Sequence, residues 1–127
     1  MCIRDSLLVP ESVIPLWGAD GGSKSTLPDL MQYLKFQLET KHPAVVESHK
    51  VVQFWNEEVS TGYFWPIHTE AIEGTYYSHH GGAFGTQLWV FIIPKHDLAM
   101  TIITNQSDME TAGKLLTTAN AILDDIR

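Results

Sequence analysis

The chain has 127 residues, of which 44% are hydrophobic and 18% charged, so it can bury one core and has no room for two domains. Its 8 Lys and Arg residues against 15 Asp and Glu residues give a net charge of -7, and the basic residues form no run. This balance excludes nucleic acid and anionic membrane surfaces as expected partners.

The N-terminal region shows no targeting signal. Residues 1–6 contain no apolar run of signal-peptide length, and we interpret them as a non-native extension. From Leu7 to Gly22, proline and glycine interrupt short apolar pieces, which predicts irregular chain. The longest apolar stretch, Leu88 to Pro94, is too short to span a membrane, and the single cysteine, Cys2, excludes a disulfide within the chain.

The first predicted helix begins after Thr26. This residue can cap a helix through Asp29 three positions later, and Pro28 is tolerated in a first turn. Leu27, Leu30, Met31, Leu34 and Leu38 then follow the helical spacing and predict a stripe that faces a core. After Pro43, the piece Ala44 to Val46 fits either a brief helix or a turn, and the residues do not separate the two.

The middle of the chain predicts β-strands, because β-branched and aromatic residues dominate it. The expected strands are Val51 to Trp55, Gly62 to Ile67, Gly74 to His80, Leu88 to Ile93 and Leu98 to Thr104. Their short separators, Asn56 to Thr61 among them, favour an antiparallel meander, since parallel pairing needs long crossovers. The many aromatic residues in this region are best explained by core packing.

A second helix is predicted from about Glu110 to the end of the chain. Ala112, Leu115, Leu116, Ala119, Leu123 and Ile126 share one side of it. A helix, a run of antiparallel strands and a final helix predict an α+β fold, with the helices packed on the sheet.

The stretch from Tyr76 to Gln87 is the main candidate for chemistry, because His79 and His80 run directly into the glycines Gly81, Gly82 and Gly85. Adjacent strand residues point to opposite faces, so this histidine pair cannot form a metal site alone. No His-x-x-x-His or Cys-x-x-Cys spacing occurs, and a strand rather than a helix follows the glycines. We therefore expect neither a metal nor another cofactor; a turn-flanking polar pair remains the alternative on these grounds.

The stretch His79-His80-Gly81-Gly82-x-x-Gly85 resembles the His-x-Gly form of the Lys-Thr-Gly element of serine β-lactamases, penicillin-binding proteins, D-aminopeptidases and related esterases. Gly21-Gly22-x-x-Ser25-Thr26-x-x-Asp29-Leu30 resembles the stretch that opens a helix upstream in this family. Gly62 to Trp65, Phe91 to Pro94 and Ile102 to Asn105 resemble the strands around the motif. The resemblance covers roughly Gly18 to Ile126 in the family's order.

The resemblance implies that residues 7–127 are the C-terminal part of a catalytic domain with a β-lactamase/transpeptidase-like fold. It assigns catalytic roles to His79, beside the nucleophile, and to Gly82, whose backbone N–H would donate to the oxyanion. It makes His80 and Gly81 substrate-binding residues. The substrate would be a small-molecule or peptide-like amide or ester lying along the strand, and the location periplasmic or secreted.

Two departures limit this assignment. The family's Ser-x-x-Lys nucleophile motif and its Tyr-x-Asn or Ser-x-Asn element are both missing from the 127 residues. We therefore expect the nucleophile in a missing N-terminal half, and the chain alone to be inactive. Histidine also replaces the family's lysine, so recognition of an anionic substrate would be weaker and pH-dependent. The alternative function is a non-catalytic binding module with the same groove.

Overall fold

A computed structural model describes residues 2–4, 7–9, 23–83 and 85–126. The chain divides into two compact units, each described by itself. The α3 unit comprises Met1–Lys24, His80–Trp89 and Ile102–Arg127, and the α1 unit comprises Ser25–His79 and Val90–Thr101. The division therefore falls within strands, and it separates His79 from His80.

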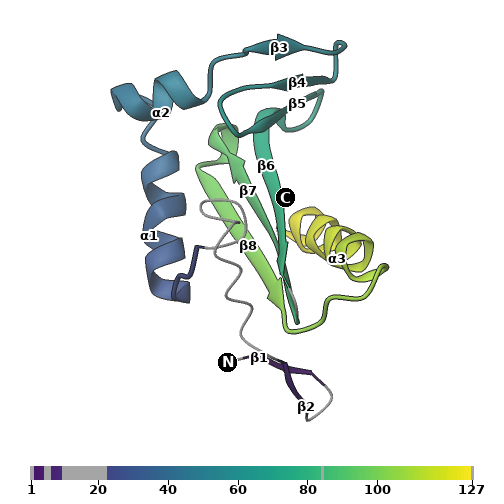
Figure 1. Ribbon diagram of the computed structural model, residues 1–127. Coiled ribbons are helices and arrows are strands. Elements are labelled where there is room, and N and C mark those ends of the chain that lie inside the picture. Colours follow the sequence, from purple (N-terminus) through teal and green to yellow (C-terminus); the bar gives the residue numbers. More distant parts are fainter. Residues whose placement is uncertain (1, 5–6, 10–22, 84, 127) are drawn as a thin grey trace. The chain divides into compact units, whose positions relative to one another are not determined.

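Helix α1 (Leu27–Gln37) forms where the capping pattern predicted it (Figure 1). The Thr26 hydroxyl accepts a hydrogen bond from Asp29 N at 3.3 Å and donates one to Asp29 Oδ2 at 2.7 Å. The predicted apolar stripe is only partly correct, because Leu34 is fully buried whereas Leu27 and Met31 are exposed. Helical spacing determines which side chains share a face, but not what covers that face.

Helix α2 (Pro43–Ser48) resolves the alternative that the sequence left open after Pro43. His42 Nδ1 accepts a hydrogen bond from Ala44 N at 3.2 Å, which satisfies one free N–H of the first turn. The chain leaves α2 through His49 and Lys50 and then enters the first strands of the sheet (Figure 1).

The sheet is an antiparallel meander of six strands in the order β3-β4-β5-β6-β7-β8, as the short connections predicted. Together with the helices it confirms the α+β fold. The strands are β3 (Gln53–Phe54), β4 (Val59–Thr61), β5 (Pro66–Glu70), β6 (Gly74–Ala83), β7 (Thr86–Ile93) and β8 (Leu98–Thr104). A 3-10 turn, η1 (Pro94–His96), joins β7 to β8.

Several strand predictions need correction. Strand β6 continues past the predicted end at His80 to Ala83, and β7 begins at Thr86 rather than Leu88. Strand β4 lies in a stretch predicted as a separator, and β3 is shorter than predicted. The predicted strand Gly62 to Ile67 begins only at Pro66, because residues 62–65 form a tight turn closed by a 2.8 Å hydrogen bond from Gly62 N to Trp65 O. Trp55 and Phe64 are exposed, so core packing does not explain these two aromatic residues.

The core of the α1 unit explains the continuous apolar run in β7. Residues Val90 to Ile93 are all buried, which means that this part of the strand is covered on both faces. Leu34, Val45, Trp65 and Ile67 are the other buried apolar residues of the unit.

The connections β5–β6 and β7–β8 contact each other within the α1 unit. Lys95 Nζ donates a hydrogen bond to Ile72 O at 2.6 Å, and His96 Nε2 lies 3.2 Å from a carboxylate oxygen of the buried Glu73. Asp97, with a φ of 49°, lies in the left-handed region and reverses the chain into β8.

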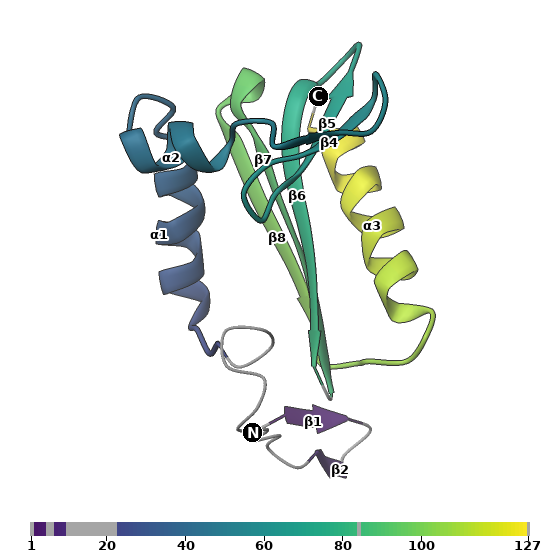
Figure 2. The ribbon, with the colours of Figure 1, turned by 45° about the horizontal axis from the view of Figure 1, so that its top comes forward.

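The α3 unit contains the C-terminal helix α3 (Thr111–Asp125), drawn in yellow in Figure 2. Trp89 Nε1 donates a hydrogen bond to Ala112 O at 3.0 Å, which ties the helix to strand β7. Ala119 and Leu123 of the predicted apolar side are buried, but Ile126 is exposed, contrary to the prediction.

The N-terminal residues form a small hairpin in which β1 (Cys2–Arg4) pairs with β2 (Leu7–Val9). This corrects the prediction of irregular chain for residues 7–9. Residues 10–22, including Gly21 and Gly22 of the upstream motif, lie outside the described residues.

Candidate active site on strand β6

All four predicted site residues lie on strand β6, beyond the part that pairs with β5. The register between the two strands runs from Glu70↔Gly74 to Ile67↔Tyr77. Because β5 begins at Pro66, the stretch of β6 from His79 onwards has no β5 residue opposite it. No described β5 residue therefore pairs with the N–H and C=O groups on this side of that stretch.

His79 is an exposed residue of the α1 unit, and Trp65 supports its ring. The two rings meet edge to face, with centroids 6.2 Å apart and an interplanar angle of 87°. Trp65 is itself buried, so one side of the imidazole rests against a fixed surface while the rest remains accessible.

His80, in the α3 unit, makes different contacts. Its Nε2 lies 3.3 Å from Gln87 Oε1, and its ring packs at 5.0 Å from that of Trp89. Adjacent strand residues point to opposite faces, in agreement with these separate surroundings. Substrate binding through His80 stays a prediction.

Gly81 and Gly82 do not have a positive φ, so their contribution is the absence of a side chain. A Cβ on Gly81 would meet Leu88 at an ordinary 3.7 Å, whereas one on Gly82 would lie 3.3 Å from Gln87 Cγ, a tight contact. Of the glycines near the motif, Gly85 has a positive φ, 74°, and its N–H donates to Ser107 Oγ at 2.9 Å. Gly85 thus shapes the turn, as expected.

His49 was not selected from the sequence, although it lies in the same cluster as Trp65. Its ring stacks on Tyr77 at 3.8 Å and 15°, and meets Trp65 edge to face at 6.0 Å. Burial lowers the pKa of His49 and raises that of Tyr77, so both rings are neutral near pH 7. Only tertiary packing brings these residues together, and no local sequence signal could have identified them.

Ser78 and His68 form a second pair that the sequence did not reveal. Ser78 Oγ and His68 Nε2 are 2.9 Å apart, which is within the range of a nucleophile and its base. Ser78 is only 4% exposed, however, so a substrate cannot reach its hydroxyl. The pair is therefore better explained as a structural hydrogen bond between β5 and β6.

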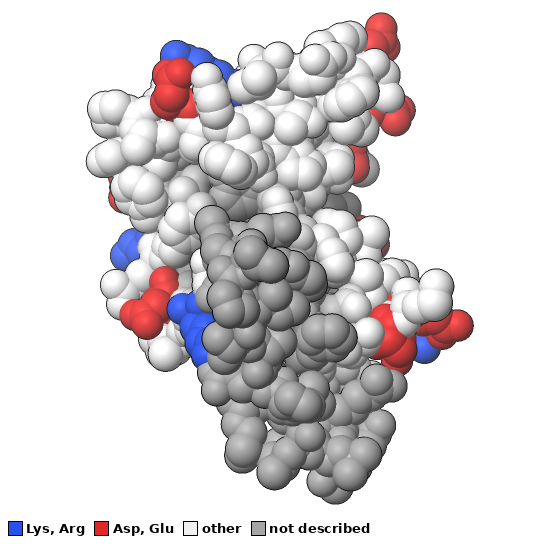
Figure 3. All heavy atoms as spheres, in the orientation of Figure 1, with Lys and Arg blue, Asp and Glu red and all other residues white. Residues whose placement is uncertain are grey.

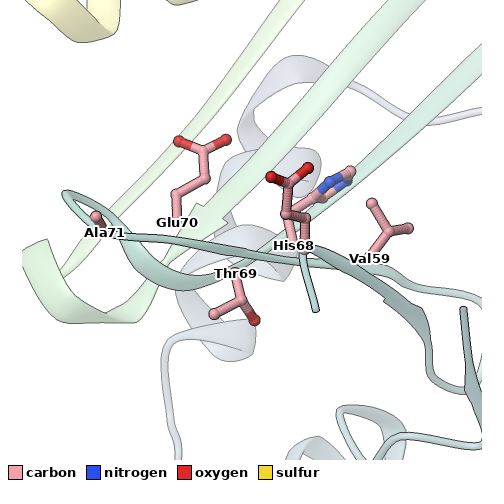
Figure 4. A pocket seen from close by; sticks show the side chains of 6 residues that line it. Val59, His68, Thr69, Glu70 and Ala71 are labelled. Atoms are coloured by element: carbon pink, nitrogen blue, oxygen red, sulfur yellow. The ribbon is translucent and has the colours of Figure 1, made fainter. Parts of the chain in front are cut away.

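A pocket of about 410 Å³ lies beside this pair (Figure 4). Its lining residues are Glu58, Val59, His68, Thr69, Glu70 and Ala71. Burial lowers the pKa of His68, and the charge of Glu70 opposes this effect only in part. Two carboxylates, those of Glu58 and Glu70, line the pocket together with this imidazole. The described residues contain no group of three or more ligating side chains that could hold a metal ion.

Comparison with protein-family models gives a match to the Beta-lactamase model over residues 4–124. The chain belongs to the Beta-lactamase family. Membership in this family supports a serine hydrolase type of function, and the predicted family is confirmed. The search of curated proteins returned no match.

Two further properties of this Beta-lactamase family chain are the distribution of its basic side chains and the character of its helices. Basic side chains lie apart from one another on the described part of the face in Figure 3. Among the described residues, no helix is long and apolar enough to cross a membrane.

Proposed function

We propose that this chain forms the His-x-Gly wall of a serine hydrolase that cleaves an amide or ester through an acyl-serine intermediate. The observation that carries the proposal is the position of His79 on the part of β6 that β5 leaves unpaired. An extended substrate can add to this edge through main-chain hydrogen bonds, as peptides do at other open sheet edges.

Each site residue then has a defined role. His79 supplies a hydrogen bond or positive charge beside the nucleophile, with its ring held against Trp65. The Gly82 N–H donates to the oxyanion that develops on the scissile carbonyl, the position where a preorganised donor lowers the barrier most. Gly81 lets the substrate backbone approach, because nothing larger than a hydrogen atom projects from its Cα.

The nucleophile is proposed to come from a Ser-x-x-Lys segment outside these 127 residues, since no serine of this sequence is followed by lysine at the third position. The boundary between a non-native extension at residues 1–6 and the domain at 7–127 also stays a prediction. A Ser-x-x-Lys in frame before Leu7 in the upstream genomic sequence would support the first statement, and a different native sequence joined to Leu7 there would support the second.

The experiment that tests the site compares His79→Ala with His80→Ala in the protein that also carries the Ser-x-x-Lys segment. We expect His79→Ala to lower turnover by about 10- to 1000-fold, or roughly 1.4 to 4 kcal/mol of transition-state stabilisation. His80→Ala should cost less, because its side chain contacts Gln87 and Trp89.

Circular dichroism of both variants serves as the control for folding. Equal turnover in two folded variants would mean that the His-x-Gly match is only a turn, and would favour the non-catalytic binding module. The same two substitutions remove an imidazole from one strand, so a general loss of stability cannot imitate the expected difference.

A further inference from the structure

Phe64 combines a strained backbone conformation with an exposed apolar ring, and both features are unfavourable for stability. Its φ is +66°, in the left-handed region that bulky residues rarely adopt, and its side chain is 87% exposed. Neither backbone preference nor burial against the described residues explains a phenylalanine at this position. Strained residues of this kind persist where the surrounding structure holds them, and they concentrate at functional sites.

The turn that carries Phe64 is held in place by its neighbours. Gly62 N donates to Trp65 O at 2.8 Å, and Tyr63 N donates to Ser48 O at 3.2 Å. A Cβ on Gly62 would lie 2.9 Å from the carbonyl oxygens of both Ser48 and Lys50, which shows how closely the turn sits against the end of α2. The Phe64 ring is thus presented from a fixed turn rather than from a loose loop.

The turn lies beside His79 of the candidate site. Trp65, the next residue, contacts His79, and β5 begins one residue later. A substrate strand that pairs with β6 from His79 onwards would continue the line of β5 and would meet this turn first. Tyr63 is half-exposed, and residues 62–67 carry no charged side chain, so the surface offered there is aromatic and uncharged.

We propose that Tyr63 and Phe64, on the turn that the buried Trp65 anchors, form a subsite for an apolar, preferably aromatic, group of the acyl substrate, with Phe64 as the residue that determines specificity. This inference rests on the function proposed above, because it places the substrate along β6. Aromatic side chains on a rigid turn recognise such a group by covering its rings with little loss of conformational entropy.

A binding experiment tests the subsite without requiring turnover. The probes are the N-phenylacetyl and N-acetyl forms of one alanyl-alanine amide, titrated into the isotope-labelled protein while amide shifts are followed by NMR. The phenylacetyl peptide should bind about tenfold more tightly, the preference expected from covering roughly half of a phenyl ring.

The decisive variant is Phe64→Asn, with Phe54→Asn as the matched control. Asparagine tolerates a positive φ, so Phe64→Asn should keep or raise the melting temperature while the two probes bind with equal affinity. Phe54 is also exposed, lies on β3 and lacks a positive φ, so its replacement should leave the tenfold preference intact.

The outcomes separate this inference from the proposed function. An unchanged preference in Phe64→Asn, or binding of neither peptide by the native chain, would overturn the subsite. Equal turnover of His79→Ala and His80→Ala, by contrast, would contradict the proposed chemistry and would leave the measured preference between the two peptides unaffected.

Discussion

Gly62→Ala gives the sharpest test of how the α1 unit is packed. The added Cβ would lie 2.9 Å from Ser48 O, 2.9 Å from Lys50 O and 3.1 Å from Ile67 Cδ1. Two of these neighbours are backbone atoms, so the chain must move, and overpacking of this kind costs about 1–3 kcal/mol. The movement also threatens the hydrogen bond from Tyr63 N to Ser48 O, worth about 1 kcal/mol.

We therefore expect Gly62→Ala to lower the free energy of unfolding by about 2–4 kcal/mol. Urea unfolding followed by circular dichroism and tryptophan fluorescence measures this change. Gly113→Ala is the matched control, because a Cβ at this position of α3 meets nothing within 4 Å. The control should be neutral or stabilising by up to about 1 kcal/mol, since alanine favours helix more than glycine does.

The reasoning would be refuted by a Gly62→Ala protein within about 0.5 kcal/mol of the original, the range of an ordinary surface substitution. A change of equal size and sign in Gly113→Ala would also refute it, because a methyl group in open space would then matter as much as one against two carbonyl oxygens.

Three further predictions use other parts of the molecule. Burial lowers the pKa of His49 and His68, so below about pH 6.5 the unfolded chain binds more protons than the folded one and stability falls as the pH drops from about 7 to 5. Unfolding at both pH values measures this, and a pH dependence that survives replacement of both histidines by glutamine would contradict it. Thr26→Ala removes the cap of α1 and should cost about 1 kcal/mol, measured by the same unfolding experiment, whereas Thr26→Ser should cost much less. The chain alone should not hydrolyse nitrocefin or p-nitrophenyl acetate above a buffer control; turnover that one serine substitution abolishes would disprove this.

The sequence predicted those elements that local chemistry determines. The Thr26–Asp29 cap marked the start of α1, and the apolar run from Leu98 to Thr104 matched β8 residue for residue. The stretch Gly62 to Trp65 was misread as a strand because its aromatic residues are typical of strands. Its turn depends instead on the close approach of Gly62 to the end of α2, which strand propensity does not report.

Only those residues of the candidate site that follow one another on strand β6 could be predicted from the sequence. His79 to Gly82 are contiguous, so their order and alternation could be read from the motif. The support of His79 by Trp65, and that of Trp65 by His49, joins residues from three segments that are separate in the sequence. Such contacts follow from packing, and no spacing along the chain encodes them.

The hydrogen bond from Lys95 to Ile72 O and the 3.2 Å contact between His96 and Glu73 link two chain reversals that are over 20 residues apart. A residue inserted into one reversal would displace its partner groups in the other. Natural variation in length or charge at residues 71–74 should therefore be accompanied by changes at residues 94–97, so that an alignment of relatives would show correlated substitutions there.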